Sequence, residues 1–310
     1  MKYTFLFIIV LLTGCRNAWV DPDKEVWIDM NDTTTSTVEQ SYQASKDIVR
    51  VAIASMTTPV ETMYKYDQMF SYLEKRLNKK IVLVQRKSYK EVNDLLKNNE
   101  LDMAFICSGA YVAGMKDSAF KIFLNPMHNK EIHYHAYVIT KKDSPFKNFS
   151  DLAGKKFVYS DSLSNTGMYY PLKKINELGI DPDSFFSKTY LSNAHNNSMA
   201  LVNRGIVDAT SVNSLIFDYI KKVNPEKVSN IKIIEVSEPF GMPPLVVSNH
   251  IDSALYHELH SILTGMDKDP EGNKILRGLM IDKYVDGTDS NYNSIREMCK
   301  SIGYPNIMAK

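Results

Sequence analysis

Small polar residues gather in the stretch SDSLSNTGMYYPLKK, which occupies positions 160–174. Hydroxyl groups, an amide and a glycine stand there directly before residues typical of the first turns of a helix. A helix N-terminus needs only one such side chain as a cap. Several of them, together with the free backbone N–H groups of the first turn, form a binding site for an oxyanion. The stretch therefore predicts either a helix cap or an anion-binding turn at Ser164, Asn165, Thr166 and Gly167.

Alternating apolar and amphipathic runs predict the elements that position this turn. In the first part of the chain, expected strands alternate with expected helices, and the second helix opens with a capping box from Ser88 to Glu91. The strands are expected at residues 48–54, 81–85 and 101–107, and the helices at 66–77 and 88–96. This order predicts an α/β domain with a mainly parallel sheet.

A second α/β unit follows, and two connections are expected to join it to the first. The strand HAYVIT at 135–140 runs into the polar residues KKDSPF, and the strand IKIIEVS runs into PFGMPPLVVSNH. Two such lobes place the carboxyl ends of their strands around a cleft, where ligands bind in open α/β sheets. The polar strand-to-helix junctions expected at this cleft are residues 88–89, 108–109, 164–167 and 193–197.

The N-terminal residues predict export and lipid anchoring. Lys2 precedes an apolar run at 5–12, which is shorter than the roughly 20 residues of a membrane-spanning helix and typical of a secretory signal. The following LTGC resembles a bacterial lipobox, in which the cysteine is lipidated and becomes the new N-terminus. We expect residues 1–15 to be a signal peptide, Cys15 to carry the lipid, and the polar residues 16–46 to be a flexible tether.

Charge, cysteine content and motifs exclude several other classes of protein. The chain has 310 residues, a length that suits two domains, and its formal net charge of +1 provides no broad basic surface for nucleic acid. Besides Cys15 it has Cys107 and Cys299, and the sequence leaves open whether these pair. Gly-x-Ser-x-Gly and His-Glu-x-x-His motifs are absent. We expect a binding protein without a cofactor, and not an enzyme.

Three blocks of the sequence resemble the phosphate/phosphite/phosphonate-binding proteins of bacterial ABC importers. They are SYLEKRLNKKIVLVQRKSYKEVNDLLKNNELDMAFI, SLSNTGMYYPLKK and AHNNSMALVNRGIVDATSVNS, and the similarity covers about residues 49–247. The resemblance implies a two-lobed α/β fold of the type II periplasmic-binding-protein class, with two crossings between the lobes. We expect lobe 1 to comprise residues 47–138 and 240–310, and lobe 2 to comprise residues 139–239.

The same resemblance implies a ligand site between the lobes. Its oxyanion-binding turn, cleft histidine and two cleft tyrosines match Ser164, Asn165, Thr166, Gly167, His195, Tyr89 and Tyr134. Asn165 stands where the family has a threonine. Two acidic residues that engage the amino group of aminoalkylphosphonates fall on Leu215 and Pro243 here. This departure favours a smaller oxyanion or one with an uncharged substituent, such as phosphate, phosphite or a simple phosphonate.

The implied function is that of a monomeric, lipid-anchored solute-binding protein that faces the periplasm or the cell exterior and serves ABC permease subunits. Two alternatives stay open at this point. The same fold and ligand chemistry would suit a sensor lipoprotein. In addition, His128, His133 and His135 lie close together in the sequence and would suit a transition metal if their side chains converge.

Overall fold

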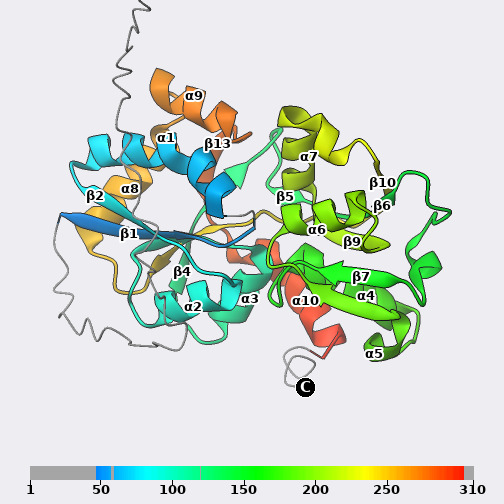
Figure 1. The fold of residues 1–310 in the computed structure, drawn as a ribbon. Helices are drawn as coiled ribbons and strands as arrows, with labels where there is room; N and C mark the ends of the chain where they lie inside the picture. The colour runs from blue at the N-terminus through cyan, green and yellow to red at the C-terminus, as the bar shows by residue number, and fades with distance from the viewer. Residues whose placement is uncertain (1–46, 57–58, 119, 304–310) are drawn as a thin grey trace, which may run out of the picture. The chain divides into compact units, whose positions relative to one another are not determined.

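The computed structural model describes residues 47–56, 59–118 and 120–303 of the chain (Figure 1). The predicted signal peptide, Cys15 and the tether lie outside these residues. Within the described ranges, every helix is too short or too polar to cross a membrane.

The first sheet has the strand order β13-β4-β12-β3-β1-β2. Its strands are β1 (Ile48–Ile53), β2 (Lys80–Val84), β3 (Met103–Phe105), β4 (Phe120–Met127), β12 (Leu245–Ser248) and β13 (Lys283–Asp286). Strand β1 pairs in parallel with β2 and β3, whereas β12 is antiparallel to both of its neighbours and β13 is antiparallel to β4. The sheet is therefore mixed rather than mainly parallel. Apolar runs predict strands but not the partner that a strand from a distant part of the chain will choose.

The second sheet has the order β10-β6-β9-β7-β8 and is also mixed. Its strands are β6 (Ala136–Lys141), β7 (Lys156–Tyr159), β8 (Lys188–Leu191), β9 (Ala209–Asn213) and β10 (Ile231–Val236). Strand β7 is parallel to β8 and β9, and β6 is antiparallel to β9 and β10. Below, the first and second lobes denote these two sheets with the helices that cover them.

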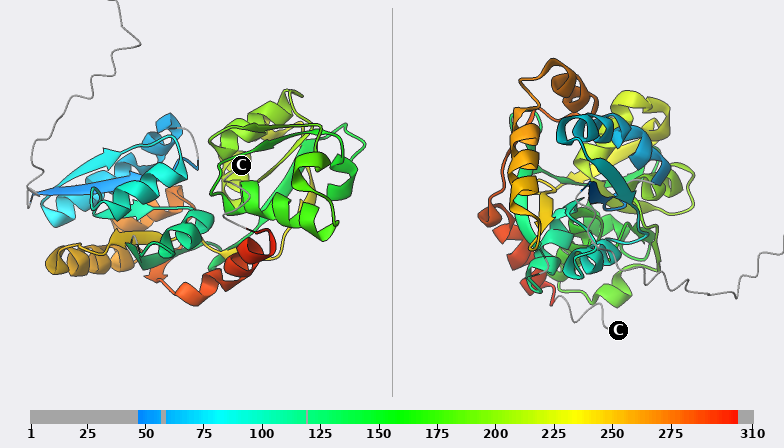
Figure 2. Two further views of the ribbon diagram at one scale, coloured as in Figure 1. Left: turned by 90° about the horizontal axis from the view of Figure 1, so that it is seen from below. Right: turned by 90° about the vertical axis from the view of Figure 1, so that its left-hand side faces the viewer.

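Helices cover both faces of each sheet (Figures 1 and 2). On the first sheet, one face packs against α1 (Pro59–Leu77), α8 (Ser253–Gly265) and α9 (Pro270–Gly278), and the other against α2 (Tyr89–Lys97) and α3 (Ser108–Met115). On the second sheet, one face packs against α6 (His195–Asn203) and α7 (Ser214–Val223), and the other against α4 (Tyr170–Glu177) and α5 (Pro182–Phe185). The alternating burial of strand side chains explains these two-sided cores.

The predicted capping box at the start of α2 is confirmed. The hydroxyl of Ser88 accepts the backbone N–H of Glu91, and the Glu91 carboxylate accepts the N–H of Ser88 at 2.8 Å. Two N-terminal N–H groups are thereby satisfied by side chains. The cap fixes the position at which Tyr89 enters the helix.

Two short connections join the lobes. Strand β5 (His133–Tyr134) lies in the first connection and pairs with β11 (Phe240–Gly241), which lies in the second connection. Strand β6 belongs to the second sheet from its first residue, Ala136. The first connection therefore precedes this strand, whereas the sequence analysis placed it after the strand and drew the lobe boundary at residue 138. The composition of this apolar run suits a strand in either sheet. Only its hydrogen-bonded partner strand shows to which lobe it belongs.

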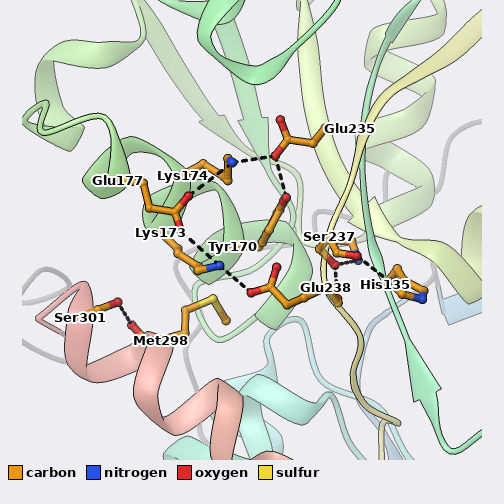
Figure 3. A network of polar contacts seen from close by, with 11 residues as sticks. His135, Tyr170, Lys173, Lys174, Glu177, Glu235, Ser237, Glu238, Met298 and Ser301 are labelled. Atoms are coloured by element: carbon orange, nitrogen blue, oxygen red, sulfur yellow. Dashed lines mark hydrogen bonds and ion pairs between the residues drawn. The ribbon is translucent and has the colours of Figure 1, made fainter.

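A polar network ties α4 to the edge strand β10 and to the second connection (Figure 3). Lys174 forms ion pairs with Glu235 at 3.0 Å and Glu177 at 3.3 Å, and Lys173 reaches Glu238 at 2.6 Å. The hydroxyl of Tyr170 donates to Glu235 at 2.7 Å. These contacts hold the helix that directly follows the predicted oxyanion turn.

The last described helix, α10 (Asn293–Ser301), contacts α3 of the first lobe and α4 of the second. Its residues Ile295, Met298 and Cys299 are buried in the core that also contains Ile175 of α4. Cys299 and Cys107 are both free thiols. The question that the sequence left open is settled, because these two cysteines do not pair.

Candidate ligand-binding site

The predicted oxyanion turn follows β7 and forms the start of a helix. The hydroxyl of Ser164 caps this helix by accepting the N–H of Gly167 at 3.0 Å. Residues Asn165–Tyr169 form a π-helical turn that runs into α4. A Cβ atom on Gly167 would lie 2.6 Å from the hydroxyl oxygen of Ser160, so only glycine lets the turn approach the end of β7 this closely.

Asp161 links this turn to the first lobe. Its buried carboxylate accepts the N–H of Leu163 at 2.8 Å and the N–H of Tyr89, the first residue of α2, at 3.1 Å. Burial raises the pKa of this carboxyl group, while the two N–H bonds oppose the shift. Both carboxylate oxygens are occupied by backbone donors, so we assign Asp161 a positioning role rather than ligand contact.

Tyr134 of β5 reaches the turn from the connection between the lobes. Its hydroxyl lies 2.6 Å from the hydroxyl of Ser108, and the side-chain amide of Asn165 donates to it at 3.1 Å. Tyr137 lies three residues further along the chain, in β6. Its hydroxyl instead donates to Asp218 at 3.3 Å, so Tyr134 is the tyrosine that faces the turn.

His195 lies at the start of α6, and its ring is completely buried. Burial lowers the pKa of the imidazole to about 3, so the ring is neutral near pH 7. The backbone N–H of Asn213 donates to Nδ1 at 3.4 Å, so Nδ1 is unprotonated and Nε2 carries the hydrogen. Nε2 lies 3.4 Å from the hydroxyl of Ser164. The ring thus presents one N–H donor toward the turn.

Several polar atoms of this cluster are buried without a hydrogen-bond partner among the described residues. They include the hydroxyls of Tyr89 and Thr166 and the side-chain carbonyl of Asn165. The Tyr89 hydroxyl faces Ser164 without forming a hydrogen bond of normal geometry. An unsatisfied buried polar group costs about 1–3 kcal/mol. A bound oxyanion would accept hydrogen bonds from the two hydroxyls and relieve that cost.

The structure brings together all seven residues that the sequence analysis placed in the site. Hydrogen-bond contacts link Tyr134 with Asn165 and Ser164 with Gly167 and His195, and Tyr89 belongs to the same buried cluster as Leu163, directly before the turn. Residues 108–109 were expected at a polar junction of the cleft, whereas sequence reasoning gave no separate role to Ser160 or Asp161. Ser108 and Ser160 bond Tyr134 and His195 at 2.6 and 2.9 Å. The sequence feature that could have identified Ser160 and Asp161 as site residues is their position between the end of a strand and the turn.

The proposed histidine metal site does not form. Nδ1 of His128 lies 2.7 Å from the carbonyl oxygen of Met280, and Nδ1 of His135 lies 2.7 Å from that of Ser237. His133 faces Glu131. Among the described residues, no group of three histidine, cysteine or acidic side chains converges as metal ligands. The metal alternative is wrong for this part of the chain, because neighbours in sequence diverge where the chain passes between the sheets.

A family model for the periplasmic phosphonate substrate-binding protein of ABC transporters matches residues 51–292. The chain belongs to this family. Its members are substrate-binding components and not enzymes, and they act outside the cytoplasm. The match includes all seven candidate ligand-binding residues.

A probable ABC transporter phosphite-binding protein, PhnD1 of Prochlorococcus marinus (strain MIT 9301), is 23% identical over 157 residues, which are 49% of this chain and 53% of the relative. The chain thus spans about half the length of this curated relative. Among solved structures, a binding component of an ABC phosphonate transporter of Pseudomonas aeruginosa has a TM-score of 0.79 at 18% identity, covering 85% of this chain and 89% of that one.

The structure of Prochlorococcus marinus PhnD1 in complex with methylphosphonate has a TM-score of 0.75 at 16% identity, with 83% of this chain and 98% of that chain covered. At these identities the likeness shows the fold. The expected two-lobed α/β fold of the type II periplasmic-binding-protein class is confirmed.

Proposed function

We propose that this chain is the lipid-anchored solute-binding component of an ABC importer and binds phosphate, phosphite or a simple phosphonate between its lobes. The observation that carries the proposal is the pair of buried hydroxyls beside the turn, on Tyr89 and Thr166, which have no hydrogen-bond partner among the described residues. Ser164 and His195 add an O–H and an N–H at the same place. These donors are uncharged, so they suit a small anion that is recognised by hydrogen bonds.

The number of donors is adequate for tight binding. A hydrogen bond to a charged group contributes about 1.5–3 kcal/mol, and micromolar affinity corresponds to about 8 kcal/mol. Four to six such bonds therefore suffice after the cost of association is met. Tyr89 and Tyr134 would hold the anion from the first lobe and the connection, and Ser164, Thr166 and His195 from the second lobe. A ligand bonded to both lobes stabilises the closed form, which would dock on the permease.

A thermal-shift panel on the chain without residues 1–15 tests this proposal. The panel contains phosphate, phosphite, methylphosphonate, aminoethylphosphonate, sulfate and molybdate. A ligand at about 100 times its Kd adds about 2.7 kcal/mol, which raises Tm by roughly 5–10 °C for a protein of this size. We expect such a shift with at least one phosphorus oxyanion. A panel in which none of them shifts Tm would refute the proposed ligand class.

The anchor is tested separately with the full-length chain in a bacterial host supplied with a labelled fatty acid. We expect the label on the native chain and its loss in Cys15→Ser. Equal labelling of both chains, or of neither, would refute lipidation at this cysteine. A monomer is expected in solution for the released domain, which light scattering measures directly.

A further inference from the structure

The side-chain amide of Asn165 is only half used by the folded chain. This residue is the second of the candidate oxyanion turn, and its exposed fraction is 0%. Its amide nitrogen donates to the hydroxyl of Tyr134 at 3.1 Å. Its amide oxygen is buried and has no hydrogen-bond partner among the described residues. A buried acceptor without a partner costs free energy, so a ligand that donates to this oxygen would gain affinity.

The backbone of the turn does not supply the missing donor. An asparagine at the start of a helix usually accepts the N–H of a residue two or three positions further along. For Asn165 the nearest such groups are the N–H groups of Gly167 and Met168. The hydroxyl oxygen of Ser164 accepts the first at 3.0 Å, and the backbone carbonyl oxygen of Ser164 accepts the second at 3.0 Å. Both donors are therefore already used.

The amide oxygen differs in kind from the two unpartnered hydroxyls of the site. The hydroxyls of Tyr89 and Thr166 can donate, so any oxyanion satisfies them. An amide oxygen only accepts, and an oxyanion without a proton also offers only acceptors. These two acceptors would repel each other. A phosphorus oxyanion that keeps one proton offers a P–OH donor in addition to its charged oxygens.

The charges around the turn also favour an anion of low charge. The imidazole of His195 is neutral, because burial lowers its pKa to about 3, and the hydroxyls beside it are uncharged. The nearby Asp161 is a buried acid. A second negative charge on the ligand would add to the cost of desolvation, would find no positive partner among these groups, and would be repelled by the Asp161 carboxylate.

We propose that Asn165 selects the protonation state of the ligand. Its amide oxygen accepts a hydrogen bond from a P–OH group, so the site binds the singly protonated monoanion of a phosphorus oxyanion and rejects oxyanions that carry no proton. This inference rests on the proposed function of the turn. It adds a specificity-determining role for Asn165, whose amide nitrogen meanwhile holds Tyr134.

A pair of ligands that differ by one proton tests the inference. At about pH 6, methylphosphonate carries one negative charge and one P–OH group, whereas methanesulfonate has a similar shape and the same charge but no proton. Isothermal titration calorimetry on the native chain without residues 1–15 measures both affinities at the same pH. We expect methanesulfonate to bind at least tenfold more weakly, because the amide oxygen of Asn165 stays unpaired.

A pH series separates the proton from the charge. Affinity for methylphosphonate should fall by about tenfold for each pH unit above its second pKa, since only the singly protonated form binds. Burial raises the pKa of Tyr89, Tyr134 and Cys107, so these groups stay protonated through the neutral range. Burial also raises the pKa of Asp161. The same series on Asn165→Thr isolates the amide, because this variant keeps all four groups.

The variant Asn165→Thr replaces the amide by a hydroxyl, which can accept from P–OH or donate to an anionic oxygen. We expect the preference for methylphosphonate over methanesulfonate to shrink to within about threefold and the fall of affinity with pH to flatten. Asn203→Thr is the matched control. Asn203, at the end of α6, also has a buried amide oxygen without a partner among the described residues, but it lies outside the turn. Its variant should reproduce the native preference.

The outcomes separate this inference from the proposed function. If methylphosphonate binds while methanesulfonate binds equally well, or if affinity for methylphosphonate rises with pH, Asn165 does not select a protonated ligand and the inference is overturned, while the proposed function stands. A native preference that survives unchanged in Asn165→Thr overturns it as well. If no phosphorus oxyanion binds, both fail. The two native measurements decide the question even if Asn165→Thr does not fold.

Discussion

At the scale of single residues, the site keeps hydrogen-bonding groups that the folded chain itself does not use. The hydroxyl of Thr166 is buried and has no partner among the described residues, and the same holds for Tyr89. Ser164 differs, because its oxygen caps the following helix. Removing each of the three hydroxyls should therefore change stability and ligand affinity in a different way, although all three lie at the same turn.

Thr166→Val should raise the stability of the ligand-free protein by about 1 kcal/mol, because the change replaces an unsatisfied buried hydroxyl by a methyl group of similar size. The same change should weaken phosphorus oxyanion binding by roughly 10- to 100-fold, since one donor to a charged group is lost. Denaturant unfolding and calorimetry measure the two effects. Ser164→Ala serves as the contrast, because loss of its cap should lower stability by about 1 kcal/mol. Unchanged affinity in Thr166→Val would remove this hydroxyl from the site.

The neutral imidazole of His195 predicts a pH dependence of folding. Burial lowers its pKa in the folded protein from 6.5 to about 3, so between these values the unfolded chain binds more protons. Stability from this group is complete above about pH 6.5 and is lost as the pH falls toward 3. Between pH 6.5 and 5 the loss is about 1–2 kcal/mol.

Urea unfolding of the native chain and of His195→Gln at both pH values measures this contribution. The glutamine has no group that titrates in the range, so the difference in stability loss between the two chains isolates the histidine. An identical loss in both chains would show that His195 is not held neutral by the fold.

At the scale of elements, the close approach of α3 to the oxyanion turn depends on Gly109. A Cβ atom at this position would collide with the carbonyl oxygen of Leu163 and lie 2.6 Å from the N of Asn165. Both atoms are backbone, so they cannot move aside as a flexible side chain would. The second residue of α3 thus sets how near the first lobe comes to the turn.

Gly109→Ala should lower the stability of the protein by about 1–3 kcal/mol and weaken oxyanion binding at least tenfold, because the helix and the turn must separate. Gly265→Ala is the matched control. It lies at the end of α8, and an added Cβ would meet nothing within 4 Å. Native affinity in Gly109→Ala would show that binding does not require this contact.

The sequence predicted the helices and strands better than it predicted which strands pair with each other. Ser88 and Glu91 form a local motif three residues apart, so their hydrogen bonds follow from sequence spacing. The antiparallel position of β12 beside β3 depends on residues more than 100 positions apart in the chain, which no local pattern encodes. The candidate oxyanion turn could be proposed from the sequence because its residues are contiguous. Asp161 was missed because its role depends on the N–H of Tyr89 in the other lobe.

At the scale of the whole described domain, the candidate site is closed to solvent. Ser164, Thr166, His195 and Tyr89 each have an exposed fraction of 0%. A ligand therefore reaches them only if the lobes separate. We expect the chain to bend for this at the two short connections, where β5 pairs with β11.

Small-angle X-ray scattering should detect this opening. We expect the ligand-free domain without residues 1–46 to have a larger radius of gyration than the same protein with saturating methylphosphonate, because the anion bonds both lobes. The comparison at equal protein concentration excludes association as the cause. Superimposable scattering curves at a ligand concentration that calorimetry shows to be saturating would contradict closure by the ligand.

The connections have a further consequence. The N–H of Ser237 donates to the carbonyl oxygen of Ala136 at 3.0 Å, and the N–H of Ala136 donates to the hydroxyl of Ser237 at 2.8 Å. The second lobe is thus one continuous segment whose two ends touch, inserted into a first lobe that is assembled from both sides of it. We expect that a related lobe with a different turn could be exchanged for this segment at two junctions without changing the chain order of the first lobe, provided that it keeps the face of α4 that packs against α10.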